Sequence, residues 1–414
     1  MRNPIRGYEW GSVTALACLQ GRTPDGSPEA ELWMGAHPSA PSALLPPGGP
    51  ELPLDVLIKQ SPELLGDDVL QRFGARLPYL LKVLAIAKPL SVQVHPGARR
   101  ALAAWENESD AGRQHYVDPF PKPELLYALE PMDVMCGFRP AKQASHLLEA
   151  LGGARLASVR EALDGPGEET DRLQCAFRTL VTWPDEDRNA LTTEVRDKAR
   201  LLLREVGRRP GDNEIDGDDR RALTWALRLA RLHPHDPLVV APFLLDLVRL
   251  DPGQTLFVPE GAPHAYLHGC GVEIMGNSDN VLRAGLTHKP VAVDELLEVI
   301  DGRTRPVRDV PQTRVGPHEI VWHPPAEEFQ LSRIWLTDAD PVEVWSRLRG
   351  PQILLCTRGC AVVRHGDGEV RLRAGESAFV AAGGGRTTVA GPAEVFRAAP
   401  GTADQGVGSE TFTA

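Results

Sequence analysis

Two separated segments carry side chains that could hold a metal ion. The first is Gln93-Val94-His95, in which two potential ligands are separated by one residue. On a β-strand, residues i and i+2 point to the same face, so the glutamine carbonyl oxygen and the imidazole would converge on one point. A buried histidine that is satisfied by ordinary hydrogen bonds is the alternative that this motif leaves open.

The second segment has a longer and more specific pattern. Its spacing is G-x5-P-x-G-x2-H, running from Gly253 through Pro259 and Gly261 to His264. This is the spacing of the second metal motif of cupins, in which a strand, a Gly/Pro turn and a return strand direct the histidine into a barrel. His268 stands where many cupins have asparagine, and we interpret it as a turn residue.

A divalent cation held by histidines also needs an oxygen ligand. Glu124, in the apolar segment PKPELLYAL, is the best candidate. Together, Gln93, His95, Glu124 and His264 would give Zn²⁺ two nitrogen and two oxygen ligands and leave room for water or substrate. Glutamine is an unusual ligand, and it argues against redox iron, for which two histidines and one carboxylate are commoner.

These ligands require short strands, and the sequence places strands on both sides of a helical block. Up to residue 139, apolar runs alternate with proline and glycine, and SVQVH has the period of a strand. From 140 to 249, apolar residues recur at i, i+3 and i+4, which predicts helices, and VDELLEVIDG at 293–302 predicts one more. After 310, short strands at roughly even spacing indicate a sandwich or barrel.

We therefore predict a mainly β chain built from cupin-type β-barrels. The segment GESAFVAAGG echoes the cupin turn but has no His or Glu in ligand positions, so the C-terminal barrel is expected to be degenerate and metal-free. The predicted units are a catalytic cupin domain from 1–139 together with 250–309, an inserted α-helical domain at 140–249, and a degenerate cupin-like domain at 310–414.

Composition excludes several other classes of protein. The net charge of −11 over 414 residues argues against a nucleic-acid partner, which would need a basic face. No stretch approaches the roughly 20 apolar residues that cross a membrane. The segment MRNPIRGYEWGS lacks the apolar core of a secretory signal, so a cytoplasmic location is expected. The six cysteines include no CxxC pair, which argues against thiolate-bound zinc.

Several segments together resemble the type I mannose-6-phosphate isomerase (phosphomannose isomerase) family. They are AELWMGAHPSAPS at 30–42, LPYLLKVLAIAKPLSVQVHP at 77–96, KPELLYAL at 122–129 and PEGAPHAYLHGCGVEIMGNSDNVLRAGLTHKPVAV at 259–293. In that family the residues matching Gln93, His95, Glu124 and His264 hold zinc. The resemblance implies one zinc ion per chain, a monomer, and a sugar phosphate as substrate, with interconversion of mannose 6-phosphate and fructose 6-phosphate.

Such an isomerisation moves a proton between C1 and C2 through a cis-enediol(ate), so it needs a base, an acid and a group that stabilises the oxyanion. Lys122 lies two residues from Glu124, and a nearby dication would favour its neutral amine as the base; a pairing with phosphate or a carboxylate is the alternative. Glu273 is the rival base, with a structural ion pair as its alternative.

The resemblance assigns further roles along the same segments. Arg283 looks like the active-site arginine of the family and would stabilise the enediolate, with a structural salt bridge as the alternative. Asp279 would help to open the sugar ring, and Tyr266 would bind a sugar hydroxyl or pack in the core. The phosphate contacts expected by resemblance are Ser91, Lys82 and Lys289.

The chain departs from the family pattern at two places. It has Gly97-Ala98-Arg99 after the His-Pro pair, where an acidic residue and lysine are common, and Phe120-Pro121 replaces the usual Asn-His before Lys-Pro-Glu. Two other functions fit a cupin: a metal-dependent oxygenase, which needs iron or copper in an apolar pocket, and a non-enzymatic sugar-binding protein. The lysines and arginine expected near the metal argue against the first, and the complete ligand set argues against the second.

Overall fold

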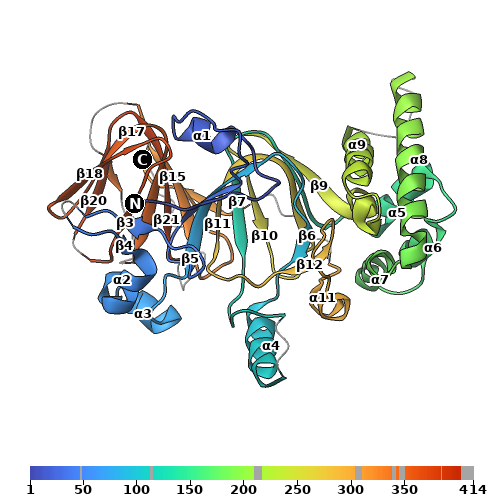
Figure 1. The fold of residues 1–414 in the computed structure, drawn as a ribbon, viewed down its shortest axis with the longest axis horizontal. Coiled ribbons are helices and arrows are strands. Elements are labelled where there is room, and N and C mark those ends of the chain that lie inside the picture. The colour runs from blue at the N-terminus through green and yellow to red at the C-terminus, as the bar shows by residue number, and fades with distance from the viewer. Residues whose placement is uncertain are drawn as a thin grey trace, which may run out of the picture.

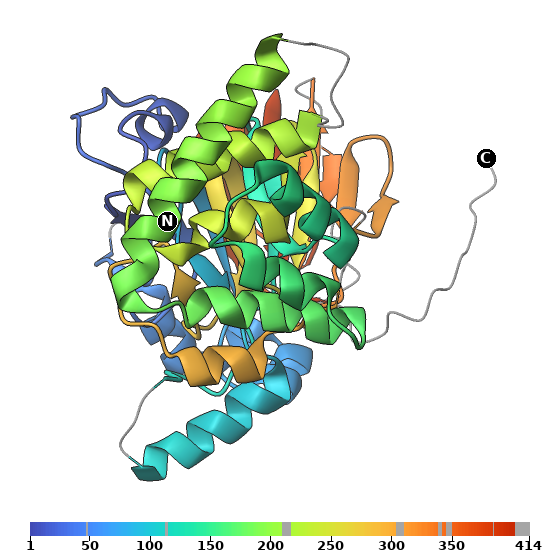
Figure 2. The same ribbon diagram turned by 90° about the vertical axis from the view of Figure 1, so that its right-hand side faces the viewer.

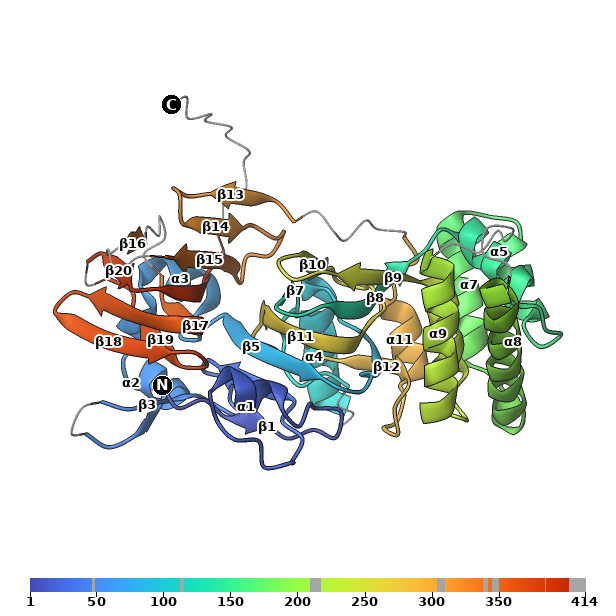
Figure 3. The same ribbon diagram turned by 90° about the horizontal axis from the view of Figure 1, so that it is seen from above.

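The computed structural model has two large antiparallel sheets: one lies in the middle of the molecule, and the other lies at the end opposite a group of helices (Figures 1 and 3). The two curled sheets confirm the predicted cupin-like β architecture. In the described part of the chain, no helix is both long and apolar enough to span a membrane. The structure describes residues 1–46, 49–111, 115–208, 217–303, 310–337, 342–344, 350–383 and 385–401.

The first sheet is organised around one long strand, β11. This strand pairs antiparallel with four others, β5, β6, β7 and β8, and the sheet curls because partners lie along both of its edges. The ten strands are β1 (Ile5–Arg6), β2 (Glu31–Met34), β5 (Tyr79–Ile86), β6 (Val92–Val94), β7 (Glu124–Ala128), β8 (Met132–Phe138), β9 (Leu245–Leu250), β10 (Thr255–Val258), β11 (His264–Gly276) and β12 (Leu282–Gly285).

The second sheet is formed by the C-terminal part of the chain and is organised around β17. Its nine strands are β13 (Gln312–Arg314), β14 (Glu319–Trp322), β15 (Gln330–Leu336), β16 (Val342–Val344), β17 (Gln352–His365), β18 (Gly368–Arg373), β19 (Ser377–Val380), β20 (Thr387–Ala390) and β21 (Ala393–Ala399). A small separate hairpin joins β3 (Ala43–Leu44) and β4 (Leu52–Pro53).

The two sheets share an apolar core. Leu81 and Val83 of β5 and Tyr127 of β7 belong to the same buried cluster as Phe329 and Phe396 from the C-terminal half. Burial of large apolar side chains stabilises such a contact by about 25 cal/mol per Å². The second sheet thus packs against the first through this shared core.

The block between β8 and β9 is helical, as its periodicity predicts, and it covers one end of the first sheet (Figure 2). Its apolar core is continuous with Val92 and Val94 of β6 and Leu282 of β12. The division of the chain into three units with these boundaries stays a prediction. The helices are α5 (Ala141–Leu151), α6 (Ala157–Asp164), α7 (Glu169–Val181), η2 (Asp185–Asp187), α8 (Arg188–Arg208), α9 (Gly217–Leu232), η3 (Pro237–Val240) and α10 (Ala241–Leu244).

The N-terminal part contains helices that the sequence analysis did not identify. The longest, α4, covers a polar, alanine-rich segment that lacks a clear apolar pattern of the kind that predicted the other helices. The helix expected at 293–302 is present as α11 and ends at Val299. The helices outside the central block are α1 (Ala15–Leu19), α2 (Leu54–Gln60), η1 (Pro62–Leu65), α3 (Asp67–Phe73), α4 (Ala98–Ala111) and α11 (Val293–Val299).

Candidate functional site

Strand pairing brings the predicted metal ligands together from three parts of the chain. His264, the first residue of β11, pairs directly with Gln93 of β6, and His95 follows the end of β6. Glu124, the first residue of β7, pairs with Met275 at the other end of β11. Because β6 and β7 both lie against β11 in a curled sheet, their side chains face one interior.

Three of the four predicted ligands form a compact cluster. The Nε2 atom of His95 lies 3.0 Å from one carboxylate oxygen of Glu124, and that of His264 lies 3.6 Å from the other. All three side chains are buried, with at most 3% of their surface exposed. Within the described residues, this is the one group of His, Cys, Asp or Glu side chains close enough to share a metal ion.

The hydrogen bonds of the two imidazoles leave both Nε2 atoms available as ligands. The Nδ1 atom of His95 donates to the backbone carbonyl of Asn280 (2.9 Å), and that of His264 donates to the carbonyl of Ala262 (3.1 Å). A carbonyl can only accept, so each proton lies on Nδ1 and each Nε2 has a free lone pair.

A cation fits this arrangement for two further reasons. The buried Nε2 atom of His95 makes no hydrogen bond, although a carboxylate oxygen of Glu124 lies 3.0 Å away. Two buried acceptor atoms this close are unfavourable unless a cation lies between them. Burial, helped by the nearby Lys122 charge, lowers the pKa of His95 to about 4, and burial also lowers the pKa of His264. Both imidazoles are therefore neutral at pH 7, the form that binds metal.

Glu124 is an ionised carboxylate with two further partners. Burial tends to raise its pKa, but the charge of Lys122 and the contacts with both histidines outweigh this and hold the pKa well below the usual value. Lys122 Nζ lies 3.0 Å from one oxygen, and the hydroxyl of Tyr266 donates to the other over 2.9 Å. Tyr266 thus orients a ligand, and burial beside this carboxylate raises its pKa well above 10.

Gln93 lies with these groups in one pocket. Its amide nitrogen donates to Ser91 Oγ (3.1 Å), which leaves the carbonyl oxygen free to act as the fourth ligand. The pocket is lined by Glu31, Lys82, Leu84, Leu90, Ser91, Gln93, Lys122, Glu124, His264, Ala265, Tyr266 and Glu273. Its wall is rich in charged groups, so it differs from the apolar pocket expected of an oxygenase.

Glu273 and Lys82 form a buried ion pair in the pocket. They face each other on β11 and β5, with Lys82 Nζ 3.2 Å from one oxygen of Glu273 and 4.0 Å from an oxygen of Glu31. Burial raises the pKa of Glu273 to about 7, although Lys82 opposes the shift. Burial would lower the pKa of Lys82, but the surrounding carboxylates outweigh it and raise the value. The ion pair that was the alternative interpretation of Glu273 is therefore present. The pKa of the same Glu273 carboxyl also suits a base.

The three predicted phosphate contacts do not form one group. Ser91 and Lys82 line the pocket, but Ser91 accepts a hydrogen bond from Gln93 and Lys82 is paired with carboxylates. Lys289 is exposed on the turn after β12 and is not among the residues that line the pocket. Phosphate binding by these three residues stays a prediction.

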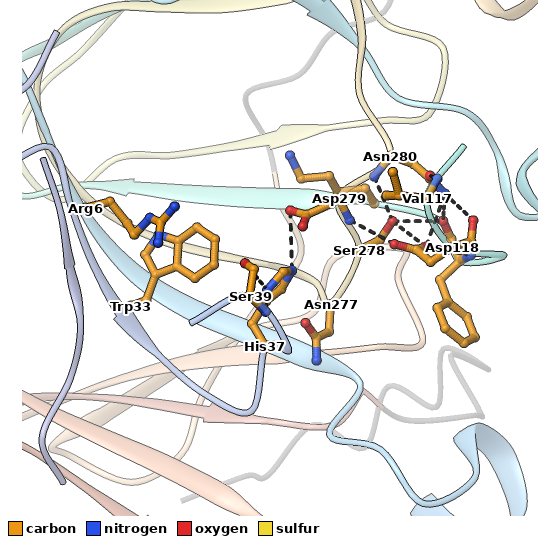
Figure 4. Close-up of polar contacts among 12 residues, drawn as sticks. Arg6, Trp33, His37, Ser39, Val117, Asp118, Asn277, Ser278, Asp279 and Asn280 are labelled. Carbon is orange, nitrogen blue, oxygen red and sulfur yellow. Dashed lines mark hydrogen bonds and ion pairs between the residues drawn. The ribbon is translucent and has the colours of Figure 1, made fainter. Parts of the chain in front are cut away.

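Arg283 and Asp279 lie on segments next to the candidate ligands, but neither is among the residues that line the pocket. Arg283 is opposite Gln93 on the neighbouring strand β12, and no carboxylate of the described residues is among the causes of its pKa shift. Burial lowers its pKa. Asp279 lies on the loop before β12, where one oxygen is 3.4 Å from Nε2 of buried His37 (Figure 4). This contact lowers the pKa of Asp279, and its effect outweighs burial, which would raise the pKa.

One interpretation from the sequence needs correction, and two residues were missed. His268 is not a turn residue: it lies within β11, exposed and opposite Asp133, because β11 continues past it to Gly276. His37 and Asp118 both contact the Asp279 loop. His37 lies in the quoted segment AELWMGAHPSAPS, whereas Asp118 carried no recognisable signal.

Comparisons with known proteins identify the family of the chain. The family model of the catalytic domain of type I phosphomannose isomerase matches residues 1–141. The mannose-6-phosphate isomerase of Escherichia coli is 34% identical over 95% of this chain and 97% of its own length, and that of Salmonella typhimurium is 35% identical over 92% and 94%.

Solved structures show the same likeness. A mutant of the Salmonella typhimurium phosphomannose isomerase superposes with a TM-score of 0.84 at 32% identity, covering 97% of this chain and 98% of that one. A zinc-bound mannose 6-phosphate isomerase gives a TM-score of 0.83 with the same identity and coverage. The chain therefore belongs to the mannose-6-phosphate isomerase family.

Proposed function

We propose that this chain interconverts mannose 6-phosphate and fructose 6-phosphate with one zinc ion bound by Gln93, His95, Glu124 and His264. The observation that carries the proposal is the convergence of two neutral imidazole Nε2 atoms on one buried carboxylate, in a pocket that also holds Lys122. Two nitrogens and two oxygens suit zinc and leave a position for substrate. The zinc-bound relative supports this choice of metal.

The bound zinc would act as a Lewis acid that polarises the oxygens on C1 and C2 of the open-chain sugar. The protein must then move one proton between these carbons through a cis-enediolate. Lys122 reaches the pocket from the segment just before β7 and Glu273 reaches it from β11, and each is a candidate base. A carboxyl with a pKa near 7 suits proton transfer at neutral pH, whereas Lys122 lies closer to the metal ligands.

The groups around this pair have complementary roles. Arg283, without a carboxylate partner in the described residues, supplies a fixed positive charge for the enediolate oxygen. Asp279, kept ionised beside His37, would assist the opening of the sugar ring. Ser91, Lys82 and Lys289 are retained as the phosphate contacts, and substrate would have to compete with Glu273 for Lys82.

Metal analysis combined with a coupled assay tests the proposal. The purified protein should contain about one zinc per chain and convert mannose 6-phosphate to fructose 6-phosphate. A chelator should remove both properties, and added zinc should restore both. Fully metal-free protein with undiminished isomerase activity, or zinc-loaded protein that is inactive on mannose 6-phosphate, would refute the proposed function.

A further inference from the structure

The loop 277–280 connects β11 to β12, and Figure 4 shows that it lies between His37 and Asp118. It carries Asp279, and the backbone carbonyl of Asn280 accepts the hydrogen bond from Nδ1 of the metal ligand His95. The conformation of this one loop therefore affects both a metal ligand and a carboxylate of the active site.

Asp118 holds this loop from outside the pocket. One oxygen of its carboxylate accepts hydrogen bonds from Ser278 Oγ (2.8 Å) and the Phe120 backbone N–H (3.0 Å). The other oxygen accepts from the backbone N–H of Asp279 (3.0 Å). Asp118 thus closes its own turn and ties that turn to the loop, four residues before Lys122.

Asn280 completes the connection between Asp118 and the metal ligand. Its buried side chain donates to the backbone carbonyl oxygen (2.7 Å) and to a carboxylate oxygen (3.2 Å) of Asp118. It also donates to the carbonyl oxygen of Phe120 (2.9 Å) and accepts from the backbone N–H of Val117 (3.0 Å). With the side chain held at both ends, the carbonyl of the same residue is fixed in front of His95. A continuous set of hydrogen bonds therefore runs from Asp118 through Asn280 to His95.

His37 contacts the same loop from the opposite side, through the side chain of Asp279 alone. The Ser39 backbone N–H donates to Nδ1 of His37 (3.2 Å), so this nitrogen is an acceptor and the proton lies on Nε2, facing Asp279. The ring is held further by Trp33, with ring centroids 4.9 Å apart. Among the described residues, the polar partners of His37 are Ser39 and Asp279, so its route to the loop is the Asp279 side chain.

We propose that Asp118 is a positioning residue of the metal centre: through Asn280 it fixes the orientation of His95, and through the Asp279 N–H it fixes the active-site carboxylate. The inference rests on the proposed zinc site of His95, Glu124 and His264. Groups that orient a ligating histidine change metal affinity by about 10- to 100-fold when they are removed. A role confined to folding would change the stability of the zinc-free protein and leave zinc affinity unaltered.

Zinc affinity, measured without sugar by competition with a chromophoric chelator, tests the inference. In Asp118→Asn, an amide NH₂ replaces the oxygen that accepts from the Asp279 N–H, so two donors face each other and this hydrogen bond is lost. We expect zinc affinity to fall about 10- to 100-fold. Asn280→Ala should give a similar loss. It keeps the backbone carbonyl that accepts from His95 but removes the side-chain hydrogen bonds that hold residue 280 in place. His37→Gln should lower kcat while its zinc affinity stays within about twofold of wild type, since it acts only on Asp279.

Asp25→Asn is the matched control, because Asp25 is an exposed aspartate that closes its own turn by accepting from the Ser27 N–H (2.8 Å). Wild-type zinc affinity in both Asp118→Asn and Asn280→Ala would overturn the inference. Should Asp118→Asn fail to fold, Asn280→Ala and Ser278→Ala decide by the same criterion. Wild-type protein that binds no zinc would instead refute the proposed function.

Discussion

Lys122 Nζ lies 3.0 Å from a carboxylate oxygen of Glu124, and both side chains are buried. The two residues are separated only by Pro123, at the point where β7 begins. The contact places an amine directly beside the carboxylate that faces both histidines. The candidate base is thus part of the hydrogen-bonded group that surrounds the proposed metal, although it need not bind the metal itself.

Lys122→Met should retain zinc and lose turnover. Removing a group that transfers a proton typically costs about 10²- to 10⁴-fold in kcat, and the ligand atoms are untouched. Zinc content and the coupled assay measure the two properties separately. Lys59→Met is the control, because Lys59 is exposed and paired with Asp55 on the surface of α2. A kcat within about threefold of wild type would remove Lys122 from the mechanism.

Gln93→Ala and His264→Ala should lose zinc and activity together. Each removes a proposed ligand atom, so zinc affinity should fall by more than the roughly 10- to 100-fold expected for groups that only orient a ligand. His268→Ala is a matched histidine control on the same strand, since His268 is exposed. Zinc content and isomerase activity that no longer change together would contradict the assigned ligand set.

The pH dependence of kcat/KM should report Glu273 if this residue is the base. Its pKa is raised to about 7 by burial, with Lys82 and Lys122 opposing and Glu124 and Glu31 reinforcing the shift. A base works only when deprotonated, so activity should fall as the pH drops through about 7 and reach its plateau above it. Glu273→Gln should abolish the reaction. Full residual activity with an unchanged pH profile would assign the base elsewhere.

Gly276→Ala should disturb the contact between the end of β11 and the segment before β7. An added Cβ would lie 2.8 Å from the Pro121 carbonyl oxygen and 3.0 Å from Pro123 Cδ. Such overpacking costs about 1–3 kcal/mol, which urea unfolding of the zinc-free protein would detect. Gly217→Ala is the control, because a Cβ there meets nothing within 4 Å. Equal stability of the two variants would contradict the tight approach.

The candidate ligands could be named from the sequence because the geometry within each segment is local. Gln93 and His95 share a strand face through the period-two alternation, and the Gly253–His264 spacing specifies a turn and a return strand. The helical block followed from its 3.6-residue period in the same way. Helix α4 was missed because its alanine-rich, polar sequence gave no comparable apolar pattern.

By itself, the sequence determined which side chains could bind a metal and which local elements carry them. Only the tertiary structure decided which of those groups face one another: strand register sets Glu273 opposite Lys82, and loop contacts bring Asp118 to Asn280 and His37 to Asp279. The physical reason is that spacing along a strand is governed by backbone geometry, whereas contacts between distant segments depend on how the whole core packs.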